Sequence, residues 1–390
     1  MEIRLIKPEE QAEADRISSI AFVNPMQEKS EYLGNVWGCF SDQGKLESIV
    51  KNWPFTVYYD GAPVPMSGIG DVASLPETRM QGGVRALISE ILRRDQDNGV
   101  VFSALYPFSH TYYRQYGYEV CAQINIVQFP IKSLSKYRHH VSEVRLVEQL
   151  SDARMLDALR ERFAQHYNMA VKRDAISWKH MLQGDIYQAQ SYRYALSKNG
   201  KVVAYLFFKP KTAGEDHAKT LRIIDFAYDG REGLHALFGF LYKLSSQYQT
   251  VKMELPCDLP MDTLLDEPYD ITQEPYYARW MARLVCVEEG LSGLRRPRGD
   301  WQCSIAVRDD FLPHNSGTYQ LQCSDTGIDV LKTKSDTADL SLSIQTLTQL
   351  CLGYLSLDMA LLKEDVTLCG NRELLAHLFQ KKPIYMSDKF

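Results

Sequence analysis

A loop that joins a strand-like segment to a helix-like segment carries the residues best suited to bind a phosphate group. Residues 67–75 are rich in small residues, and Arg79, Gly82 and Gly83 follow just before an apolar helical pattern begins. The first turn of a helix has N–H groups without intrahelical partners and a partial positive charge, so it attracts phosphate oxygens. Glycine lets the backbone approach the phosphates, and an arginine can add a charge-assisted contact. The loop is therefore a candidate pyrophosphate site.

Arg-x-x-Gly-Gly is not specific alone, because an ordinary strand-to-helix turn with a surface arginine has the same pattern. The surrounding sequence favours the functional interpretation. Val-x-x-Leu-Pro-Glu precedes the loop (72–77), Gly-Val-Arg-Ala-Leu opens the helix (83–87), and Tyr-Tyr-Arg-Gln-Tyr-Gly-Tyr follows at 112–118. Together these segments resemble the GCN5-related N-acetyltransferases (GNAT), whose loop reads Arg/Gln-x-x-Gly-x-Gly/Ala.

The resemblance implies acetyl-CoA as acetyl donor and no metal. In this family the strand backbone holds the pantetheine arm and the loop amides hold the pyrophosphate. Mapped onto this sequence, the cofactor-binding residues are Val72, Ser74, Arg79, Gln81, Gly82 and Gly83. Two positions depart from the family: Val84 stands at the last Gly/Ala position, and Met80 replaces a second arginine. The second departure puts one phosphate contact in doubt.

Further landmarks extend the resemblance to the whole chain. They are Trp37-Gly38-x-Phe40, Tyr113-x-x-Tyr116-Gly117-Tyr118, Trp280 to Val285, and an aromatic last residue. This set resembles the enhanced intracellular survival (Eis) acetyltransferases. It implies two tandem GNAT-like α/β units and a sterol-carrier-protein-like α+β unit, over residues 1–140, 141–285 and 286–390. It also implies a homo-oligomer, with a hexamer as the family's form.

Acetyl transfer to an amine needs a base for the ammonium, whose pKa is near ~10.4, and a proton for the departing thiolate. In the resembling family these are the chain's terminal carboxylate and a tyrosine, here Phe390 and Tyr113. A terminal carboxyl has an ordinary pKa of ~3.3–3.7, so it must be desolvated to act as a base. A frayed tail is the alternative for Phe390. Most of the tyrosines in residues 112–118 must belong to the core. Tyr113 is the best candidate among them for the group that gives its proton to the thiolate.

The elements that position these groups can be predicted from local patterns. Helices are expected over 8–21, from Gly83 through 84–94 to a break at 97–99, and over 110–116. Strands are expected over 36–40, 46–50, 55–59, 67–75, 100–105 and 124–129, all in the first unit. The second unit repeats strand, helix and strand over 221–255, which suggests an internal duplication. A linker is expected at 256–277. Antiparallel strands then cover 300–307, 317–323 and 327–333, with helices at 344–354 and 371–378.

The second unit lacks the phosphate-loop motif. Asp225 and Asp229 stand where its loop would be, and carboxylates there would repel a pyrophosphate. We therefore expect this unit to be structural or to wall the acceptor pocket. Phe22 and Trp37 are candidate apolar walls of that pocket, with ordinary core as the alternative for each.

Composition excludes several other classes. The formal net charge of −5 argues against nonspecific nucleic-acid binding, and the arginine-rich 294–298 lacks an aromatic platform. The eight cysteines form no CxxC pair, so a zinc site lacks its ligand spacing. Ser109-His110 has no Gly-x-Ser-x-Gly elbow that would suggest a hydrolase. No apolar run is long enough for a membrane span. We expect a cytoplasmic protein with reduced thiols.

Two function classes follow from these patterns. The first is an N-acetyltransferase that acts on a small amine, such as an aminoglycoside, a polyamine or a lysine side chain. The second is a lipid or small-ligand binding protein that uses the sterol-carrier-like unit and keeps a vestigial acetyltransferase unit. The presence of Arg79, Gly82 and Gly83 favours the first class, because a vestigial loop would not need to keep these residues. The sequence does not identify the acceptor, and a dedicated protein substrate remains a third option.

Overall fold

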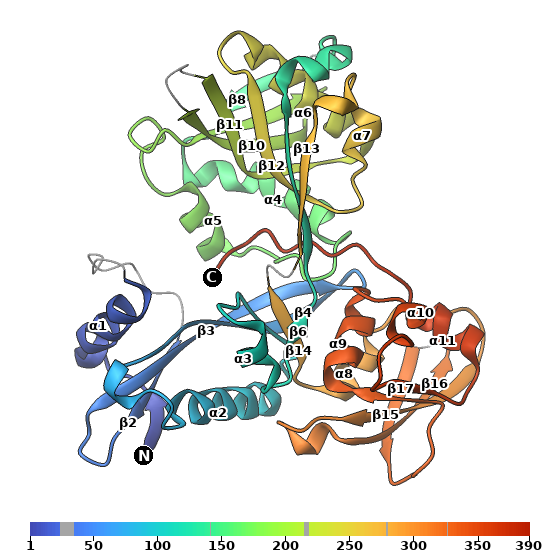
Figure 1. Ribbon diagram of the computed structural model, residues 1–390. Helices are drawn as coiled ribbons and strands as arrows, with labels where there is room; N and C mark the ends of the chain where they lie inside the picture. The colour runs from blue at the N-terminus through green and yellow to red at the C-terminus, as the bar shows by residue number, and fades with distance from the viewer. Residues whose placement is uncertain (24–34, 141, 214–217, 278–279, 326) are drawn as a thin grey trace. The chain divides into compact units, whose positions relative to one another are not determined.

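The chain passes back and forth between two separately packed units. The structure is a computed structural model that describes residues 1–23, 35–140, 142–213, 218–277, 280–325 and 327–390. The first unit comprises Met1–Cys121, Ala278–Lys382 and Asp388–Phe390. The second comprises Ala122–Tyr277 and Pro383–Ser387. Each unit is described separately below (Figure 1).

A seven-stranded sheet forms the centre of the first unit, in the order β1-β2-β3-β4-β5-β14-β6. Its strands are β1 Glu2–Leu5, β2 Asn35–Phe40, β3 Leu46–Tyr59, β4 Ala62–Ser74, β5 Phe102–Leu105, β6 Glu119–Val120 and β14 Met281–Leu284. β4 and β5 are parallel, whereas the other neighbours are antiparallel. The two strands predicted at 46–50 and 55–59 are one strand, because β4 pairs with β3 along nearly its whole length.

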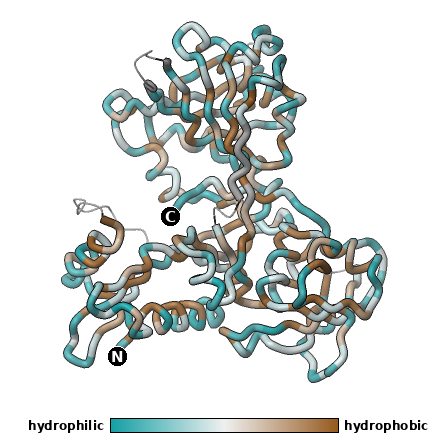
Figure 2. The backbone as a smooth tube through the Cα atoms, viewed as in Figure 1, coloured by the Kyte–Doolittle hydropathy of each residue, from teal (hydrophilic) through white to brown (hydrophobic). Residues whose placement is uncertain are grey.

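Helices cover both faces of this sheet. Apolar residues at helical spacing predict the helix that begins at Gly83, and Leu87, Ile88, Ile91 and Leu92 of α2 (Gly83–Asp97) are all buried. α1 (Gln11–Phe22) packs with a separate cluster that includes Ile49 and Ala73. The short α3 (His110–Arg114) follows β5. Figure 2 shows hydrophobic residues concentrated along the strands and on one side of α2.

The second unit repeats this plan. Its sheet has the order β13-β7-β12-β11-β10-β9-β8. The strands are β7 Gln123–Pro130, β8 Glu143–Leu146, β9 Tyr192–Lys198, β10 Lys201–Ala213, β11 Ala218–Tyr228, β12 Thr250–Pro256 and β13 Thr272–Tyr277. The helices are α4 Ala153–Ala164, α5 Ala175–Leu182, α6 Gly230–Lys243 and α7 Met261–Leu264. β11 and β12 are the parallel pair, as β4 and β5 are in the first sheet.

The two sheets exchange one strand. β7 follows β6 in the chain but lies in the second sheet, between β12 and β13. β14 follows β13 but lies in the first sheet, between β5 and β6. The strand predicted at 124–129 therefore exists, but its assignment to the first unit is wrong. The expected linker at 256–277 contains α7 and β13.

The remainder of the first unit is an α+β segment. Its sheet has the order β17-β16-β15-β18-β19, with β15 Trp301–Arg308, β16 Gly317–Ser324, β17 Gly327–Thr333, β18 Leu340–Ser343 and β19 Thr367–Leu368. The helices are α8 Val287–Ser292, α9 Ile344–Leu352, α10 Leu357–Ala360 and α11 Arg372–Leu378. α9 packs against both β15 and β14. The three antiparallel strands and the helices predicted at 344–354 and 371–378 are present.

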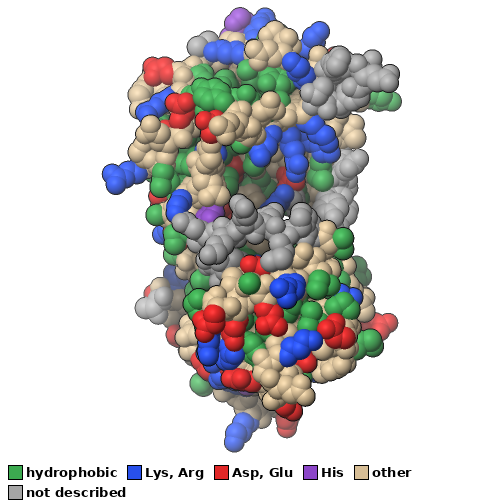
Figure 3. All heavy atoms as spheres, turned by 90° about the vertical axis from the view of Figure 1, so that its left-hand side faces the viewer, with side chains coloured by type: hydrophobic (Ala, Val, Ile, Leu, Met, Phe, Trp, Pro, Cys, Tyr) green, Lys and Arg blue, Asp and Glu red, His purple; other side chains and the backbone are tan. Residues whose placement is uncertain are grey.

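Acidic and basic side chains are interspersed on the side of the first unit that carries α1, as Figure 3 shows. Within the described ranges, no helix combines the length and the apolar character that a membrane crossing requires.

Candidate active site

The loop between β4 and α2 has the backbone conformation of an anion-binding turn. Met80 and Gly82 both have positive φ, at 65° and 87°. Gly82 is the residue that caps α2 and has no side chain to bond the first N–H groups of that helix, and no other described side chain bonds to them. Those N–H groups therefore remain available to an anionic ligand.

Arg79 and Gly83 are placed in a way that fits phosphate binding, whereas Met80 and Val84 contribute nothing to it. Arg79 is exposed and has no hydrogen-bond or ion-pair partner among the described residues. A Cβ on Gly83 would lie 2.8 Å from Ser48 Oγ, so only glycine lets α2 begin this close to β3. Val84 is half-buried against the core under α2. Met80 points fully into solvent and makes no contact that replaces an arginine.

The edge of β4 beyond Ile69 is open. β5 pairs with β4 only from Met66 to Ile69, and no described strand pairs with that edge between Gly70 and Ser74. A bulge interrupts the β3 pairing here, and Asp71 within it has φ of 43° and an ion pair with Lys51. Backbone groups of Val72 and Ser74 can therefore bind an extended ligand as a strand would.

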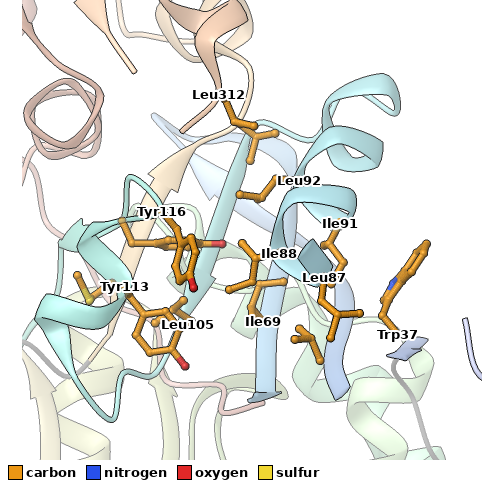
Figure 4. Close-up of a cluster of buried hydrophobic side chains, with 14 of the residues drawn as sticks. Trp37, Ile69, Leu87, Ile88, Ile91, Leu92, Leu105, Tyr113, Tyr116 and Leu312 are labelled. Carbon is orange, nitrogen blue, oxygen red and sulfur yellow. The ribbon is translucent and has the colours of Figure 1, made fainter. Parts of the chain in front are cut away.

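Tyr113 lies beside the point where β4 and β5 separate. It belongs to the same buried cluster as Ile69 and Leu105, the last paired residues of the two strands. Figure 4 shows Tyr113 next to Leu105. The side chain is 2% exposed, and no described residue hydrogen-bonds to its hydroxyl. Burial, followed by the neighbouring tyrosines, raises the pKa of Tyr113, so it stays protonated at neutral pH.

Phe390 packs against the other face of the sheet at this same point. Its ring lies 5.1 Å from the ring of Phe55, 5.3 Å from Tyr106 and 6.1 Å from Trp53, centroid to centroid. The Tyr106 hydroxyl donates a 3.0 Å hydrogen bond to the carbonyl of Asp388. A backbone oxygen of Phe390 lies 3.7 Å from the position that a Cβ on Gly70 would occupy.

The two candidate catalytic groups thus approach the gap from opposite faces. Ile69 and Gly70 are consecutive in β4 and point to opposite sides of the sheet. Tyr113 packs on the side of Ile69, and Phe390 packs on the side of Gly68 and Gly70. An acyl group held along the open edge of β4 would end between them. This arrangement suits acyl transfer, with one group for each proton.

Among the described residues, neither predicted pocket residue makes a ring contact with Phe390 or Tyr113. Trp37 lies in the core at the far end of the cluster from Tyr113 (Figure 4), with the Arg94 guanidinium 4.6 Å from its ring centre. Phe22 ends α1, is 42% exposed, and has no ring contact to Phe390 among the described residues.

The residues that surround Phe390 were missed in the sequence. Trp53 and Phe55 occupy alternate positions of β3, where they pair with Gly68 and Met66 of β4. The ring of Trp53 lies next to Gly70, and the ring of Phe55 lies next to Gly68. Glycines at alternate positions of a strand leave room on one face, which is the signal that could have found this site.

The corresponding loop of the second unit is closed. Only Asp229 separates β11 from α6, and its carboxylate is paired with Arg162 at 3.1 Å and Lys201 at 2.9 Å. A Cβ on Gly233 would lie 2.1 Å from the carbonyl oxygen of Val203, so α6 begins directly on β10. Asp225 is buried deeper in β11, in an ion pair with Arg173. Nothing in this geometry resembles the open loop before α2.

Comparison with protein families assigns most of the chain. Residues 2–121 and 169–284 each match an acetyltransferase (GNAT) domain family. The chain therefore contains two GNAT acetyltransferase domains. Residues 287–387 match a sterol carrier protein domain, so two GNAT domains precede a sterol carrier domain. No curated protein matches the chain.

Solved structures share the whole architecture of the chain. A GCN5-related N-acetyltransferase from Anabaena variabilis has a TM-score of 0.88 at 23% identity, over 100% of both chains. A probable N-acyltransferase from Enterococcus faecalis has a TM-score of 0.86 at 24% identity, over 100% of this chain and 99% of that chain. Eis1 from Mycobacterium abscessus has a TM-score of 0.82 at 20% identity, over 100% of both chains. At such identities the likeness establishes the fold.

GNAT domains use acetyl-CoA, and the loop before α2 fits its pyrophosphate for the reasons given above. Among the described residues, no group of three or more His, Cys, Asp or Glu side chains is placed to hold a metal ion.

Proposed function

We propose that the chain transfers the acetyl group of acetyl-CoA to a primary amine in a ternary complex, as an Eis-like enzyme. The acceptor class is an aminoglycoside, a polyamine or a lysine side chain. The observation that carries the proposal is the docking of Phe390 at the gap between β4 and β5, opposite Tyr113. The packing of its ring over Gly68 would hold the carboxylate of Phe390 beside Gly70.

The donor would bind along the open edge of β4. Backbone groups of Val72 and Ser74 would hold the pantetheine arm, and the amides of Gln81, Gly82 and Gly83 would hold the pyrophosphate. Arg79 would add a charged contact. The acetyl group would then end near Gly70, where pairing with β5 has stopped.

The terminal carboxylate of Phe390 would accept a proton from the substrate ammonium. The neutral amine would attack the acetyl carbon, so that a C–N bond forms and the C–S bond breaks. The nitrogen would lose its second proton and the departing thiolate would gain one, so that an amide and the free CoA thiol leave. Tyr113 would stabilise the departing thiolate. Because burial raises its pKa, Tyr113 is a weaker acid than a thiol in the unliganded protein. Its first contribution would therefore be a hydrogen bond to the sulfur, with proton transfer dependent on a change of surroundings when acetyl-CoA binds.

The same proposal covers the organisation of the chain. Residues 1–121 together with β14 would form the catalytic GNAT domain, 122–277 a GNAT domain without cofactor, and 286–390 a sterol-carrier-like domain that supplies the catalytic C-terminus. We also propose that the protein is cytoplasmic and forms a homo-oligomer, with a hexamer as the expected form.

The proposal is tested by thiol release from acetyl-CoA with a panel of aminoglycosides, polyamines and lysine peptides, using protein with an untagged C-terminus. Turnover with a panel member should fall about 100-fold or more when Phe390 is deleted, in the range of general-base catalysis. Phe390→Leu keeps the carboxylate and is the matched control. Tyr113→Phe should lower kcat and leave the KM for acetyl-CoA unchanged. Acetyl-CoA binding without turnover of any amine would reject the proposed acceptors.

A further inference from the structure

Three basic side chains stand in one line across the sheet of the second unit. Lys209 of β10 is directly opposite Arg222 of β11, and Arg222 is in turn the register partner of Lys252 of β12. Register partners on neighbouring strands point to the same face of a sheet, and neighbouring strands are about 4.8 Å apart. The three residues therefore form a line about 10 Å long, which we call the basic row.

The face that carries the basic row is open to solvent. All three side chains are exposed, whereas the residues that precede Arg222 and Lys252 in their strands, Leu221 and Val251, are fully buried. Successive residues of a strand point to opposite faces, so this alternation places the core on the other side of the sheet. A ligand therefore has direct access to the basic row.

No carboxylate neutralises the basic row. Within the described ranges, its three side chains form no ion pair and no hydrogen bond. Asp225 and Glu254 are the acidic residues of β10, β11 and β12, and Asp225 is paired with Arg173. Like charges directly opposite one another destabilise a sheet. The basic row therefore lowers the stability of this sheet unless an anion binds to it.

Further hydrogen-bond donors surround the basic row on the same face. Gln128 of β7 is the register partner of Lys252 and extends the line by one strand. Two residues farther along, Lys211, Thr220 and Thr250 form a second line across β10, β11 and β12. Together they add an ammonium group, two hydroxyls and an amide, all of which can donate to an anionic oxygen.

This set of donors is best matched by phosphate groups. The Arg222 guanidinium can bind two phosphate oxygens at once, and lysine ammonium groups act as point charges beside it. A single phosphate would reach only part of a line of this length, whereas several phosphates in a chain could contact all three cations. The two lines contain no aromatic side chain on which a base could stack, so they favour a polyphosphate over a nucleic acid.

We propose that the basic row is a binding site for a polyphosphate chain, either free or as the polyphosphate arm of a nucleotide. The site belongs to the second unit, whose own loop before α6 is closed to a cofactor, and it does not depend on acetyl transfer. Bound phosphates would neutralise the facing cations, so binding and the stability of the sheet would be coupled.

The test is a calorimetric titration of the full chain with sodium tripolyphosphate at low salt, compared with orthophosphate and ATP. The row variant replaces all three cations: Lys209→Gln, Arg222→Gln and Lys252→Gln. We expect the Kd for tripolyphosphate to rise about tenfold or more in this variant, and orthophosphate to bind more weakly than tripolyphosphate to the unmodified chain. The relative affinities for tripolyphosphate and ATP identify the source of the phosphates, and either one as the tighter ligand supports the site.

A matched control variant removes the same charge from other exposed positions of the second unit: Lys132→Gln, Arg154→Gln and Lys243→Gln. Its Kd for tripolyphosphate should stay within about twofold of the original value. Equal weakening in the row variant and the control variant would show that net charge alone is responsible and would overturn the inference. Binding of an oligonucleotide or of anionic vesicles without binding of tripolyphosphate would overturn it as well.

Arg79→Ala separates this site from the loop before α2, which is also a candidate phosphate site. This change should leave the tripolyphosphate site that is lost in the row variant intact, and the row variant should leave the KM for acetyl-CoA unchanged. If Arg79→Ala abolishes tripolyphosphate binding and the row variant retains it, the inference fails while the proposed function stands. If no amine is acetylated but the row variant alone loses tripolyphosphate, the proposed function fails and the inference stands.

Thermal unfolding gives a second readout that needs no activity. Without ligand at low salt, the row variant should unfold at a higher temperature than the unmodified chain, because the repulsion between facing cations is gone. Tripolyphosphate should raise the unfolding temperature of the unmodified chain and leave that of the row variant unchanged. A row variant of lower stability would show that the cations are structural and would overturn the inference. If the triple change prevents folding, Arg222→Gln alone, at the centre of the row, should raise the Kd about threefold or more and carries the test.

Discussion

Gly68→Ala tests whether the docked position of Phe390 matters for catalysis. A Cβ at residue 68 would lie 2.8 and 2.9 Å from two ring carbons of Phe390 and 2.8 Å from one of Phe55. These distances are too short for two carbon atoms that are not bonded to each other, so one of the rings must move. Phe55 is fixed within β3, whereas Phe390 is the last residue described and is the easier one to displace.

The size of the effect follows from the strain. Inserting one methyl group into a packed site destabilises it by about 1–3 kcal/mol. If undocking Phe390 relieves that strain, the equilibrium constant for docking falls about 5- to 150-fold, because each 1.36 kcal/mol is a factor of ten. The docked fraction falls by at most this factor, so we expect kcat for amine acetylation to fall by up to about 150-fold, with acetyl-CoA affinity measured by calorimetry unchanged.

A compensating change makes the test specific. Phe390→Leu has a smaller side chain and the same terminal carboxylate, so it should restore most of kcat in the Gly68→Ala background. Full activity of Gly68→Ala alone would refute the argument, as would equal losses in the single and double variants.

The remaining predictions concern donor binding and stability. Arg79→Ala should raise the KM for acetyl-CoA about tenfold or more, because hydrogen bonds to charged groups contribute about 1.5–3 kcal/mol; an unchanged KM would exclude the phosphate contact. Burial raises the pKa of Asp95 from 3.8 to about 6, and its Oδ2 has no hydrogen-bond partner among the described residues. The unfolded chain ionises first, so stability should fall by about 3 kcal/mol between about pH 4 and pH 6. Asp95→Asn should recover up to that amount in urea unfolding at pH 7.5 and little at pH 4; a gain independent of pH would contradict this. Arg283→Met leaves the buried Asp309 carboxylate without its ion pair and should lower the unfolding free energy by about 3–5 kcal/mol. The double change with Asp309→Leu should recover much of it, and an additive loss would show that the pair itself is not responsible.

The parts of the fold that were predictable are those set by local patterns. The helix from Gly83 to Asp97 follows from apolar spacing, and the turn before it from Gly82 and Gly83. The position of the Val84 side chain, in contrast, could not be predicted. Only the structure shows that it packs inward against the core rather than facing the loop. Local patterns determine these elements because their contacts lie within a few residues.

The exchanged strands were not predictable in the same way. Residues 124–129 have the pattern of a buried strand in either sheet, and nothing local says which neighbours they pair with. The surroundings of Phe390 are equally nonlocal, because Trp53 and Gly68 lie more than 300 residues earlier in the chain. Asp225 shows the same limit: its carboxylate pairs with Arg173, a partner 52 residues away.

The exchange of β7 and β14 has a consequence for synthesis on the ribosome. The first sheet lacks β14, the strand between β5 and β6, until Leu284 has been made, which is 163 residues (284 − 121) after Cys121. At about 5–20 residues per second, this delay lasts roughly 8–33 s. Throughout it, the edge of β5 and the apolar residues under α2 await a strand that has not yet been translated. Nascent chains arrested before residue 284 should therefore bind chaperones at this edge, and those released after it should fold both sheets nearly together.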